Sequence, residues 1–380
     1  MSMAKRTGLR VAIVHYWLVG MRGGEKVLEE LCRLYPQAVI YTHVHAPGSV
    51  SPVIERHEIR TTFVARLPFA RRLYQSYLPL MPYALEQLDL REFDLVISCE
   101  SGPAKGVLVR PDALHVCYCH SPMRYLWDMY PEYKRSAGWL ARKLMPLLTH
   151  HLRIWDALSA LRVDRFVANS HFIAQRIHRV YRREAVVIHP PVDVDRFTVG
   201  GERDDYYLVF GQLIRYKRAD LAVEAFNRLG KRLVVIGEGA LADELRRQAG
   251  PNIEFLGRQP DAVVSGYLQR CRALIFPGEE DFGIVPLEAM ACGRPVIAYG
   301  RGGALDYVLP GVTGRFFHEQ TAEALAEAVL AFEAEESLFE PAAIRRHAEG
   351  FSAERFRREM EGFVSGLLAE RGIQAPAADQ

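Results

Sequence analysis

Short apolar runs alternate with stretches of helical periodicity along most of this 380-residue chain. In the first half, the apolar runs predict β-strands at residues 9–15, 93–98, 115–119, 165–169 and 185–189. Helical segments lie between most of them. Strands that alternate with helices build a parallel sheet with both faces covered. The first half is therefore predicted to be one α/β domain.

The alternation pauses at residues 189–197 (HPPVDVDRF), where two prolines without a helical period indicate a linker. It then restarts, with strands predicted at residues 206–210, 232–236, 253–256, 273–276 and 295–299. Helices are predicted at residues 219–229, 241–248, 288–292, 323–333 and 353–368. We expect two domains, residues 1–192 and 193–365, with the last helix packing back on the first domain, and a disordered tail at residues 374–380.

The predicted fold is of the α/β class, with two Rossmann-like domains whose parallel sheets face a central cleft. The chain length agrees, because a domain takes roughly 100–200 residues. Sheets of this kind bind ligands at the carboxyl ends of their strands. Functional residues are therefore expected in the loops that follow predicted strands.

Charge and composition exclude several classes of protein. The net charge is only +2, without a long basic run, which argues against nucleic acid as the main partner. Six thinly spread cysteines need no disulfide framework, so a reducing, cytoplasmic compartment fits. Residues 1–10 lack the apolar stretch of a signal peptide. No window reaches the roughly 18 apolar residues of a membrane span, so we expect a soluble protein or one held peripherally at the inner face of the plasma membrane.

The most informative stretch is residues 277–293 (PGEEDFGIVPLEAMACG), which follows a predicted strand. A glycine here lets the backbone approach a ligand, and the start of a helix suits phosphate. Glu280 and Glu288 stand at the two ends of the stretch. Each carboxylate can accept hydrogen bonds from vicinal hydroxyls, one set on a sugar and the other on a ribose. The alternative is that Glu280 caps a loop and Glu288 is an ordinary helix acid.

The full frame, E-x-F-G-x-x-x-x-E-A-x-x-x-G, resembles family 4 of the retaining glycosyltransferases, which have the GT-B fold. The resemblance extends from the strand at Val11 to the helix after Thr321. It implies that Glu280 contacts the donor sugar and Glu288 the ribose of the nucleotide. The other residues that it places at the donor are Phe282, Gly283 and Ile284.

Residues 211–226 (GQLIRYKRADLAVEAF) resemble the G-R-L-x-x-x-K segment of the same family. The resemblance places Lys217 at the diphosphate. Gln212 replaces the family's usual arginine, and Arg215 is a candidate substitute. A departing diphosphate needs fixed positive charge, which lysine and arginine must supply if no metal does. We therefore expect neither a metal nor a cofactor, while a solvated basic turn is the alternative interpretation.

Three features of the N-terminal half extend the resemblance. Gly23 and Gly24 precede a predicted helix, as in the family's glycine-rich loop near the phosphates, although a plain helix start would look the same. His120 ends a predicted strand and resembles the histidine that touches the donor sugar, with a core histidine as the alternative. Ser170 matches a functional serine of the family, but an N-cap worth about 1 kcal/mol would also explain it.

Residues 120–127 (HSPMRYLW) resemble a branch of the family that includes bacterial polysaccharide and lipopolysaccharide mannosyltransferases. This likeness implies GDP-mannose as the donor and a lipid-linked saccharide as the acceptor, in the synthesis of cell-surface polysaccharide. Arg258 follows the predicted strand IEFLG and is expected near the nucleobase.

The implied function is that of a retaining hexosyltransferase with His120, Lys217 and Glu280 as catalytic residues. No carboxylate is clearly placed as a nucleophile, and the family is commonly assigned a front-face displacement. Three rivals stay open. They are an inverting transferase of the same fold with His15 as the base, a nucleotide-sugar epimerase, and a catalytically silent protein that binds sugar nucleotides in a membrane assembly.

Other motifs are discounted. Asp193 and Asp195 form a D-x-D pattern, but they lie in the proline-rich linker. Residues 237–242 fit the dinucleotide motif G-x-G-x-x-A, but they follow the second strand of their domain. Asp306 replaces the glutamate of the family's G-G-x-x-E loop, and its shorter carboxylate reaches less far. No common closed zinc site matches the spacing of His115, Cys117, Cys119 and His120.

Two patches combine basic with aromatic residues in the half expected to bind the acceptor. Residues 59–83 contain four arginines and no acid, with phenylalanines and tyrosines interleaved. Trp139, Arg142 and Lys143 form the second patch. Such a composition suits an anionic membrane surface. It equally fits a solvated helix that packs its apolar side inward.

Overall fold

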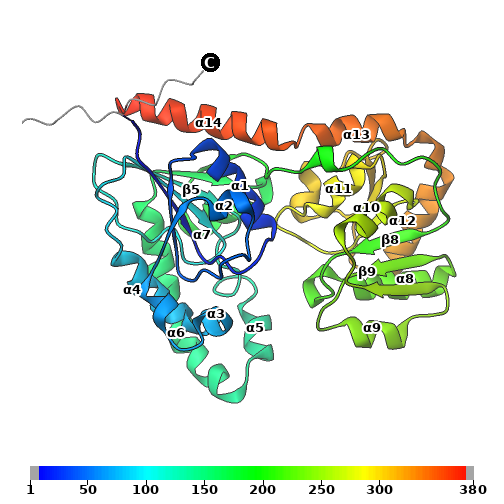
Figure 1. The fold of residues 1–380 in the computed structure, drawn as a ribbon. Helices are drawn as coiled ribbons and strands as arrows, with labels where there is room; N and C mark the ends of the chain where they lie inside the picture. The colour runs from blue at the N-terminus through cyan, green and yellow to red at the C-terminus, as the bar shows by residue number, and fades with distance from the viewer. Residues whose placement is uncertain (1–7, 374–380) are drawn as a thin grey trace, which may run out of the picture. The chain divides into compact units, whose positions relative to one another are not determined.

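The computed structural model describes residues 8–373, which divide into two compact units. The N-terminal domain consists of two segments, one that ends at Pro190 and one that begins at Phe356. The C-terminal domain is Pro191–Arg355. Each is a parallel α/β sheet flanked by helices, as the alternation of strands and helices predicts (Figure 1). The predicted tail at residues 374–380 lies outside the described residues.

The N-terminal sheet has seven parallel strands in the order β3-β2-β1-β4-β5-β6-β7. Its strands are β1 (Val11–His15), β2 (Val39–Thr42), β3 (Glu58–Thr61), β4 (Leu95–Glu100), β5 (Leu114–Cys119), β6 (Arg165–Ala168) and β7 (Ala185–Val187). Because side chains alternate along a strand, Ile13 packs on one face of the sheet and Val14 on the other.

Helices cover both faces of this sheet. The face of Ile13 packs against α1 (Gly23–Leu34), α2 (Pro52–Glu55) and α14 (Ala353–Glu370). The opposite face packs against residues of α4 (Met81–Glu86), α6 (Trp139–Ser159) and α7 (His171–Tyr181). The remaining elements are η1 (Phe63–Arg66), α3 (Ala70–Leu73), η2 (Tyr74–Leu80), α5 (Tyr130–Ser136) and η3 (Ala160–Arg162). Residues 59–83 are thus the end of a strand followed by short helices, and not the single solvated helix that the alternative interpretation of the basic patch assumed.

The C-terminal sheet has six parallel strands in the order β10-β9-β8-β11-β12-β13. Its strands are β8 (Tyr207–Phe210), β9 (Leu233–Ile236), β10 (Ile253–Gly257), β11 (Leu274–Phe276), β12 (Val296–Tyr299) and β13 (Gly314–Phe317). Its helices are η4 (Val194–Arg196), η5 (Arg215–Lys217), α8 (Ala219–Leu229), α9 (Ala242–Gln248), α10 (Asp261–Arg270), α11 (Val285–Ala291), η6 (Gly302–Asp306), α12 (Ala322–Ala334), η7 (Glu336–Leu338) and α13 (Pro341–Glu349). One hydrophobic core joins the sheet to its helices.

The domain boundary differs from the sequence-based one at the C-terminal side. The second domain ends at Arg355 and not at residue 365, because α14 buries Phe356, Met360 and Val364 in the core of the N-terminal domain. Sequence patterns also missed β2, β3 and β13. Within residues 8–373, no helix combines the length and apolar character that crossing a bilayer requires.

Candidate functional site

In the C-terminal domain, two of the predicted residues, Lys217 and Glu280, lie where the strand order reverses. The chain builds β8, β9 and β10 toward one edge and then returns to place β11 on the other side of β8. A reversal of this kind leaves a crevice at the carboxyl ends of the two central strands. Lys217 follows β8 and Glu280 follows β11, and the Lys217 ammonium lies 2.9 Å from the Glu280 carboxylate.

This Lys–Glu pair is largely withdrawn from water, with side chains 21% and 17% exposed. Burial by itself would lower the pKa of Lys217, but the Glu280 carboxylate outweighs it and raises the pKa above its ordinary value. Lys217 is therefore a fixed cation at neutral pH. It is suited to an anionic group, since a charge that is partly shielded from solvent acts more strongly than one in water.

Glycines hold the backbone around this pair. Gly211 and Gly237 both have positive φ, and a Cβ on Gly237 would lie 1.8 Å from the Gly211 carbonyl oxygen. A Cβ on Gly278 would come within 2.8 Å of the Lys217 Cα. Only glycine fits such close approaches. The loops leave a small pocket whose lining includes Gly211, Gln212, Lys217, Pro277 and Glu280.

The stretch between the two predicted glutamates folds back on the domain core. Gly283 has φ +86, and a Cβ there would lie 2.7 Å from the Phe276 ring. The Phe282 side chain is buried against Tyr307, whose hydroxyl donates to the Phe282 carbonyl. The Phe282 side chain therefore shapes this loop from inside, and its contact with the donor stays a prediction.

The remaining predicted donor residues of this domain lie in three places. Ile284 is the N-cap of α11 and is partly buried in the core, while Glu288 is a buried residue within that helix. Arg215 and Arg258 are exposed, the first in η5 after β8 and the second directly after β10. The structure places no contact between either arginine and the Lys217–Glu280 pair.

The N-terminal domain has its own reversal of strand order, between β1 and β4. His15 ends β1, Cys99 lies in β4 and His120 follows β5. His15 Nε2 donates to Glu25 Oε1 at 3.4 Å, and His120 Nε2 is hydrogen-bonded to Cys99 Sγ at 3.0 Å. A Cβ on Gly24 would lie 3.6 Å from His120 Nε2, so His120 adjoins the predicted glycine loop.

His120 is a neutral group in this setting. Burial, reinforced by the charge of His15, lowers the pKa of His120 to about 3. A neutral imidazole can donate or accept a hydrogen bond from a sugar hydroxyl, but it brings no positive charge to a phosphate. The geometry thus fits a residue that orients a sugar better than one that neutralises a leaving group.

Two N-terminal predictions change in detail. Gly23 and Gly24 form the first turn of α1 and do not precede it. Ser170 is the N-cap of α7, and its hydroxyl accepts from the Ile173 amide at 3.1 Å and donates to Asn169 at 3.2 Å. Its side chain is buried and used by these bonds, so the capping interpretation accounts for Ser170 locally.

Sequence reasoning missed Glu25. Its carboxylate accepts from His15 and, at 2.9 Å, from the Arg22 amide, which closes a capping box at the start of α1. Burial alone would raise the pKa of Glu25, but the hydrogen bond from His15 and the bonds from the backbone lower it. A glutamate placed three residues after a helix start was the available signal.

The D-x-D residue Asp195 lies at the surface, and the cysteines and histidine considered for zinc lie in the core. Asp195 lies within η4 with its side chain 96% exposed, and its carboxylate is 3.9 Å from Arg345. Cys117, Cys119 and His115 are buried, and His115 bonds to Ser98 and to the Arg162 carbonyl. All six cysteines are free.

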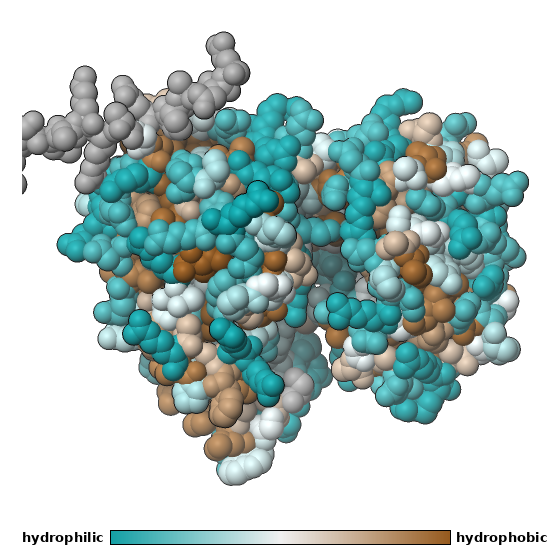
Figure 2. Space-filling model, viewed as in Figure 1, coloured by the Kyte–Doolittle hydropathy of each residue, from teal (hydrophilic) through white to brown (hydrophobic). Residues whose placement is uncertain are grey.

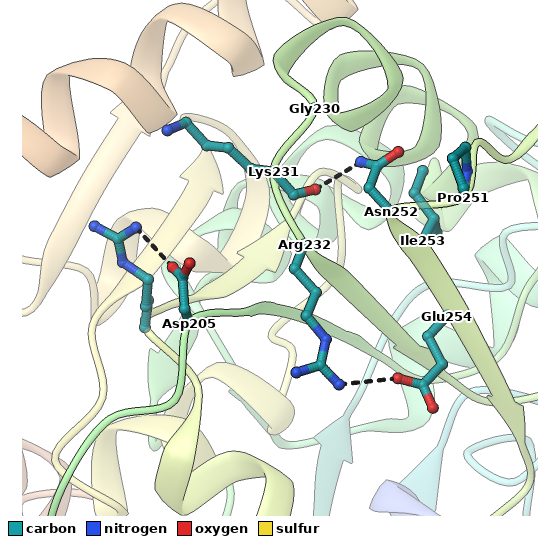
Figure 3. A pocket seen from close by; sticks show the side chains of 9 residues that line it. Asp205, Gly230, Lys231, Arg232, Pro251, Asn252, Ile253 and Glu254 are labelled. Atoms are coloured by element: carbon teal, nitrogen blue, oxygen red, sulfur yellow. Dashed lines mark hydrogen bonds and ion pairs between the residues drawn. The ribbon is translucent and has the colours of Figure 1, made fainter.

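A larger pocket, of about 690 Å³, opens at the opposite ends of the strands (Figure 3). It lies where β9 and β10 begin, and its charged groups are paired within the domain. Arg232 pairs with Glu254 at 3.2 Å, and Arg272 pairs with Asp205 at 3.2 Å. Because these charges are already compensated and lie away from Lys217, the pocket is not assigned to the reaction.

Both halves of the chain match glycosyltransferase families. Residues 21–196 match the family described as Glycosyltransferase Family 4, and residues 194–349 match the one described as Glycosyl transferases group 1. Together the two matches include Lys217, Glu280 and His120, whereas β1, which ends at His15, lies before the first matched residue.

Curated relatives agree in class. An uncharacterized glycosyltransferase, MJ1178 of Methanocaldococcus jannaschii, is 27% identical over 44% of this chain and 49% of its own length. The alpha-1,3/1,6-mannosyltransferase alg2 of Schizosaccharomyces pombe is 24% identical over 82% of this chain and 71% of its own. A D-inositol 3-phosphate glycosyltransferase of Geodermatophilus obscurus is 34% identical over 57% and 55%. The chain thus spans about half the length of two of these relatives.

Solved structures show the same fold. Anabaena Alr3699/HepE in complex with UDP superposes with a TM-score of 0.69 at 14% identity, covering 94% of this chain and 100% of that one. Sucrose-phosphate synthase of Thermosynechococcus elongatus also gives 0.69 at 17% identity, covering 95% and 100%. The predicted fold, GT-B with two Rossmann-like domains built on parallel sheets, is confirmed.

Proposed function

We propose that this chain, both of whose domains match glycosyltransferase families, is a retaining hexosyltransferase that needs no metal. Its donor is GDP-mannose and its acceptor is a hydroxyl of a lipid-linked saccharide in cell-surface polysaccharide synthesis. The observation that carries the proposal is the Lys217–Glu280 pair at the reversal of the C-terminal sheet. It sets a charged lysine beside a carboxylate that can bind sugar hydroxyls.

The chemistry follows from the charges. As the bond between the anomeric carbon and the phosphate oxygen breaks, both bonding electrons leave with the diphosphate. Lys217 offsets that charge, and the glycine-rich backbone around Gly211 lets amides approach the phosphates. The acceptor oxygen bonds to the anomeric carbon on the face that the phosphate leaves, and the leaving phosphate takes the acceptor's proton. Glu280 and His120 orient the sugar hydroxyls.

Support for mannose comes from residues 120–127 and from the likeness to the mannosyltransferase alg2. Solved structures of the same fold contain UDP or UDP-glucose, so the experiment must first identify the nucleobase of the donor. The test is a panel of GDP-, UDP- and ADP-sugars, titrated into the protein with a chelator present. We expect GDP-mannose to bind most tightly, and a preference for a UDP- or ADP-sugar would contradict the donor assignment.

One observation favours a second candidate, an inverting transferase. Glu25 accepts from His15 Nε2, so in a neutral His15 the other nitrogen, Nδ1, is unprotonated. That nitrogen is buried and has no hydrogen-bond partner in the described structure. A base held by a carboxylate has this geometry, but the His15 side chain is fully buried and closed to an acceptor. The anomeric configuration of the product, read by NMR, distinguishes the two candidates. Retention supports the retaining transferase, and inversion supports the inverting one.

Two other rivals give distinct results in the same assay. An epimerase would convert the donor with no acceptor present. A silent binding partner would bind the donor but never release free nucleoside diphosphate. Release of GDP that depends on an added saccharide acceptor would contradict both.

A further inference from the structure

The long helix α6 is inserted in the N-terminal domain with its polar side inward. Its buried residues are Thr149, Leu152, Asp156 and Ser159, three of them polar. Its outward face carries an apolar stripe, whose exposed members are Leu140, Leu144, Leu147, Ile154 and Leu158. A surface helix ordinarily turns such a stripe toward the core. The opposite orientation means that nothing in the domain covers it.

The stripe is long and regular. Leu140, Leu147 and Leu158 are 55%, 62% and 54% exposed, and the spacing of the set keeps it on one side of the helix. From Leu140 to Leu158 it runs for about 27 Å, at 1.5 Å per residue. Trp139, at the first position of α6, is 72% exposed. Contiguous apolar surface of this kind marks an interaction site.

Buried charges fix the rotation of α6. The Asp156 carboxylate pairs with the ammonium of Lys105, which is fully buried and also lies 2.8 Å from Glu100. Asp156 further accepts from Trp127 Nε1 at 2.7 Å and from the Tyr181 hydroxyl at 3.0 Å. Turning the leucines inward would break this network and leave a buried charge without its partner. The stripe is therefore held outward.

Basic side chains lie along α6: Lys143 and His150 are exposed beside the stripe, whereas Arg142 and Arg153 donate to backbone carbonyls on the other side of the helix. Residues 139–155 contain Arg142, Lys143, Arg153 and two histidines, with no acid among them. The neighbouring segment α3–η2 packs on α6 through Leu78, which joins the cluster of Leu152. It exposes further cations and apolar side chains, namely Arg71, Arg72, Phe69 and Leu73. Figure 2 shows hydrophobic residues gathered at the lower end of this domain, where α3 and α6 lie in Figure 1.

We propose that this surface, the outward stripe of α6 with the exposed residues of α3, docks on an anionic phospholipid bilayer. The leucines and Trp139 enter the interface between headgroups and acyl chains while the arginines meet lipid phosphates. A second copy of the chain fits less well. Lys143 and His150 would flank such a helix pair, and Asp156, the one acid among residues 139–159, is buried against Lys105 and cannot offset them. That the bilayer also holds the acceptor rests on the proposed function.

The first experiment is sedimentation of the full chain with vesicles of equimolar phosphatidylcholine and phosphatidylglycerol, without donor or acceptor. The test variant combines Leu144→Glu with Leu147→Glu, at side chains 49% and 62% exposed. The control combines Leu330→Glu with Leu338→Glu, which are 51% and 62% exposed in the C-terminal domain. We expect the test variant to lose at least about tenfold in vesicle affinity and the control to bind as the wild type does.

A second variant separates charge from apolar contact. Arg71→Glu with Arg72→Glu should weaken binding to these vesicles and reduce its dependence on salt, because fewer cations meet the lipid phosphates. Equal affinity of the wild type, the leucine variant and the control would overturn the proposal. The proposal would also be overturned if light scattering showed a dimer of the wild type in lipid-free solution and a monomer of the leucine variant.

The two proposals fail separately. Vesicle binding is measured without any nucleotide, whereas GDP-mannose binding is titrated in solution on the same variants. Loss of vesicle binding with unchanged donor affinity supports docking through α6 whatever the donor. Loss of both in the leucine variant would point to misfolding of the N-terminal domain and contradict a purely external role for the stripe.

Discussion

Replacing Lys217 by methionine removes the charge assigned to the leaving diphosphate but keeps much of the side chain's length. A cation about 4 Å from a phosphate charge is worth roughly 4 kcal/mol at an effective dielectric constant near 20. Loss of one preorganised charge-stabilising group from an active site typically costs about 2–4 kcal/mol in barrier. Because about 1.4 kcal/mol is tenfold in rate, Lys217→Met should lower kcat/KM by roughly 30- to 900-fold.

The same domain offers a matched control. Lys231 pairs with Glu333 at 2.7 Å, with side chains 29% and 18% exposed, much as Lys217 pairs with Glu280. It lines the larger pocket at the start of β9, at the opposite end of the sheet (Figure 3). Lys231→Met removes the same group from a similar setting, so it should leave turnover unchanged.

The assay is release of GDP from GDP-mannose with a saccharide acceptor, together with urea unfolding of each variant. The unfolding curves show whether a lost activity reflects a lost fold. If Lys217→Met turned over within about twofold of the wild type, the role of Lys217 as counter-charge would be refuted. Equal losses of activity in the Lys217 and Lys231 variants would refute the assignment of the donor site to the carboxyl ends of the strands.

Three further predictions concern stability, each read from urea unfolding. Gly237→Ala should cost more than about 2 kcal/mol, since its Cβ would collide with a backbone carbonyl, while Gly230→Ala, in open space at φ +66, should cost only about 1–2 kcal/mol; equal costs would contradict this. Asp156→Asn should cost about 3 kcal/mol by unbalancing a buried ion pair, and an unchanged midpoint would show that the pair contributes little. Burial lowers the pKa of His43 and of His115 to about 4, so below about pH 6.5 the unfolded chain binds more protons, and each histidine should lower the free energy of unfolding by about 1.4 kcal/mol per pH unit between roughly pH 6 and 4.5. A free energy that does not change between pH 7 and 5 would contradict the last prediction.

Most of the fold could be predicted because apolar runs that form strands alternate along the sequence with segments of helical periodicity. Fully buried strands such as β1 and β9 are continuous apolar runs, which stand out between helical segments. The strand β3 carries an exposed EIRT sequence at the edge of its sheet, so only pairing with β2 makes it a strand. The last helix packs on the N-terminal domain as expected, but the residue at which the C-terminal domain ends, Arg355, is set by tertiary packing and was placed too late in the chain.

The sequence predicts where a candidate site lies because Lys217 and Glu280 each follow a strand, at the end of a parallel sheet that binds ligands. Lys217 and Glu280 belong to different loops, and the reversal of strand order that joins them is a property of topology. The burial of the Phe282 side chain in the core is likewise set by packing that the sequence motif does not show. Glu25 escaped notice because its partner His15 is ten residues away and buried.

The orientation of α6 could not be predicted from the sequence. The sequence reveals the spacing of the leucines, but spacing alone does not say which side of a helix faces the core. Asp156 decides the matter, because its buried partner Lys105 comes from a distant loop. A pattern that ordinarily indicates core thus lies outside.

The central claim is that protein groups, and no divalent ion, meet the charge that leaves with the nucleotide. The most direct measurement is the initial rate of transfer from GDP-mannose with an excess of EDTA, compared with the rate after Mg²⁺ or Mn²⁺ is added. We expect equal rates in the wild type and a deficit in Lys217→Met that no ion restores. Loss of wild-type activity in EDTA, recovered on adding the metal, would contradict it.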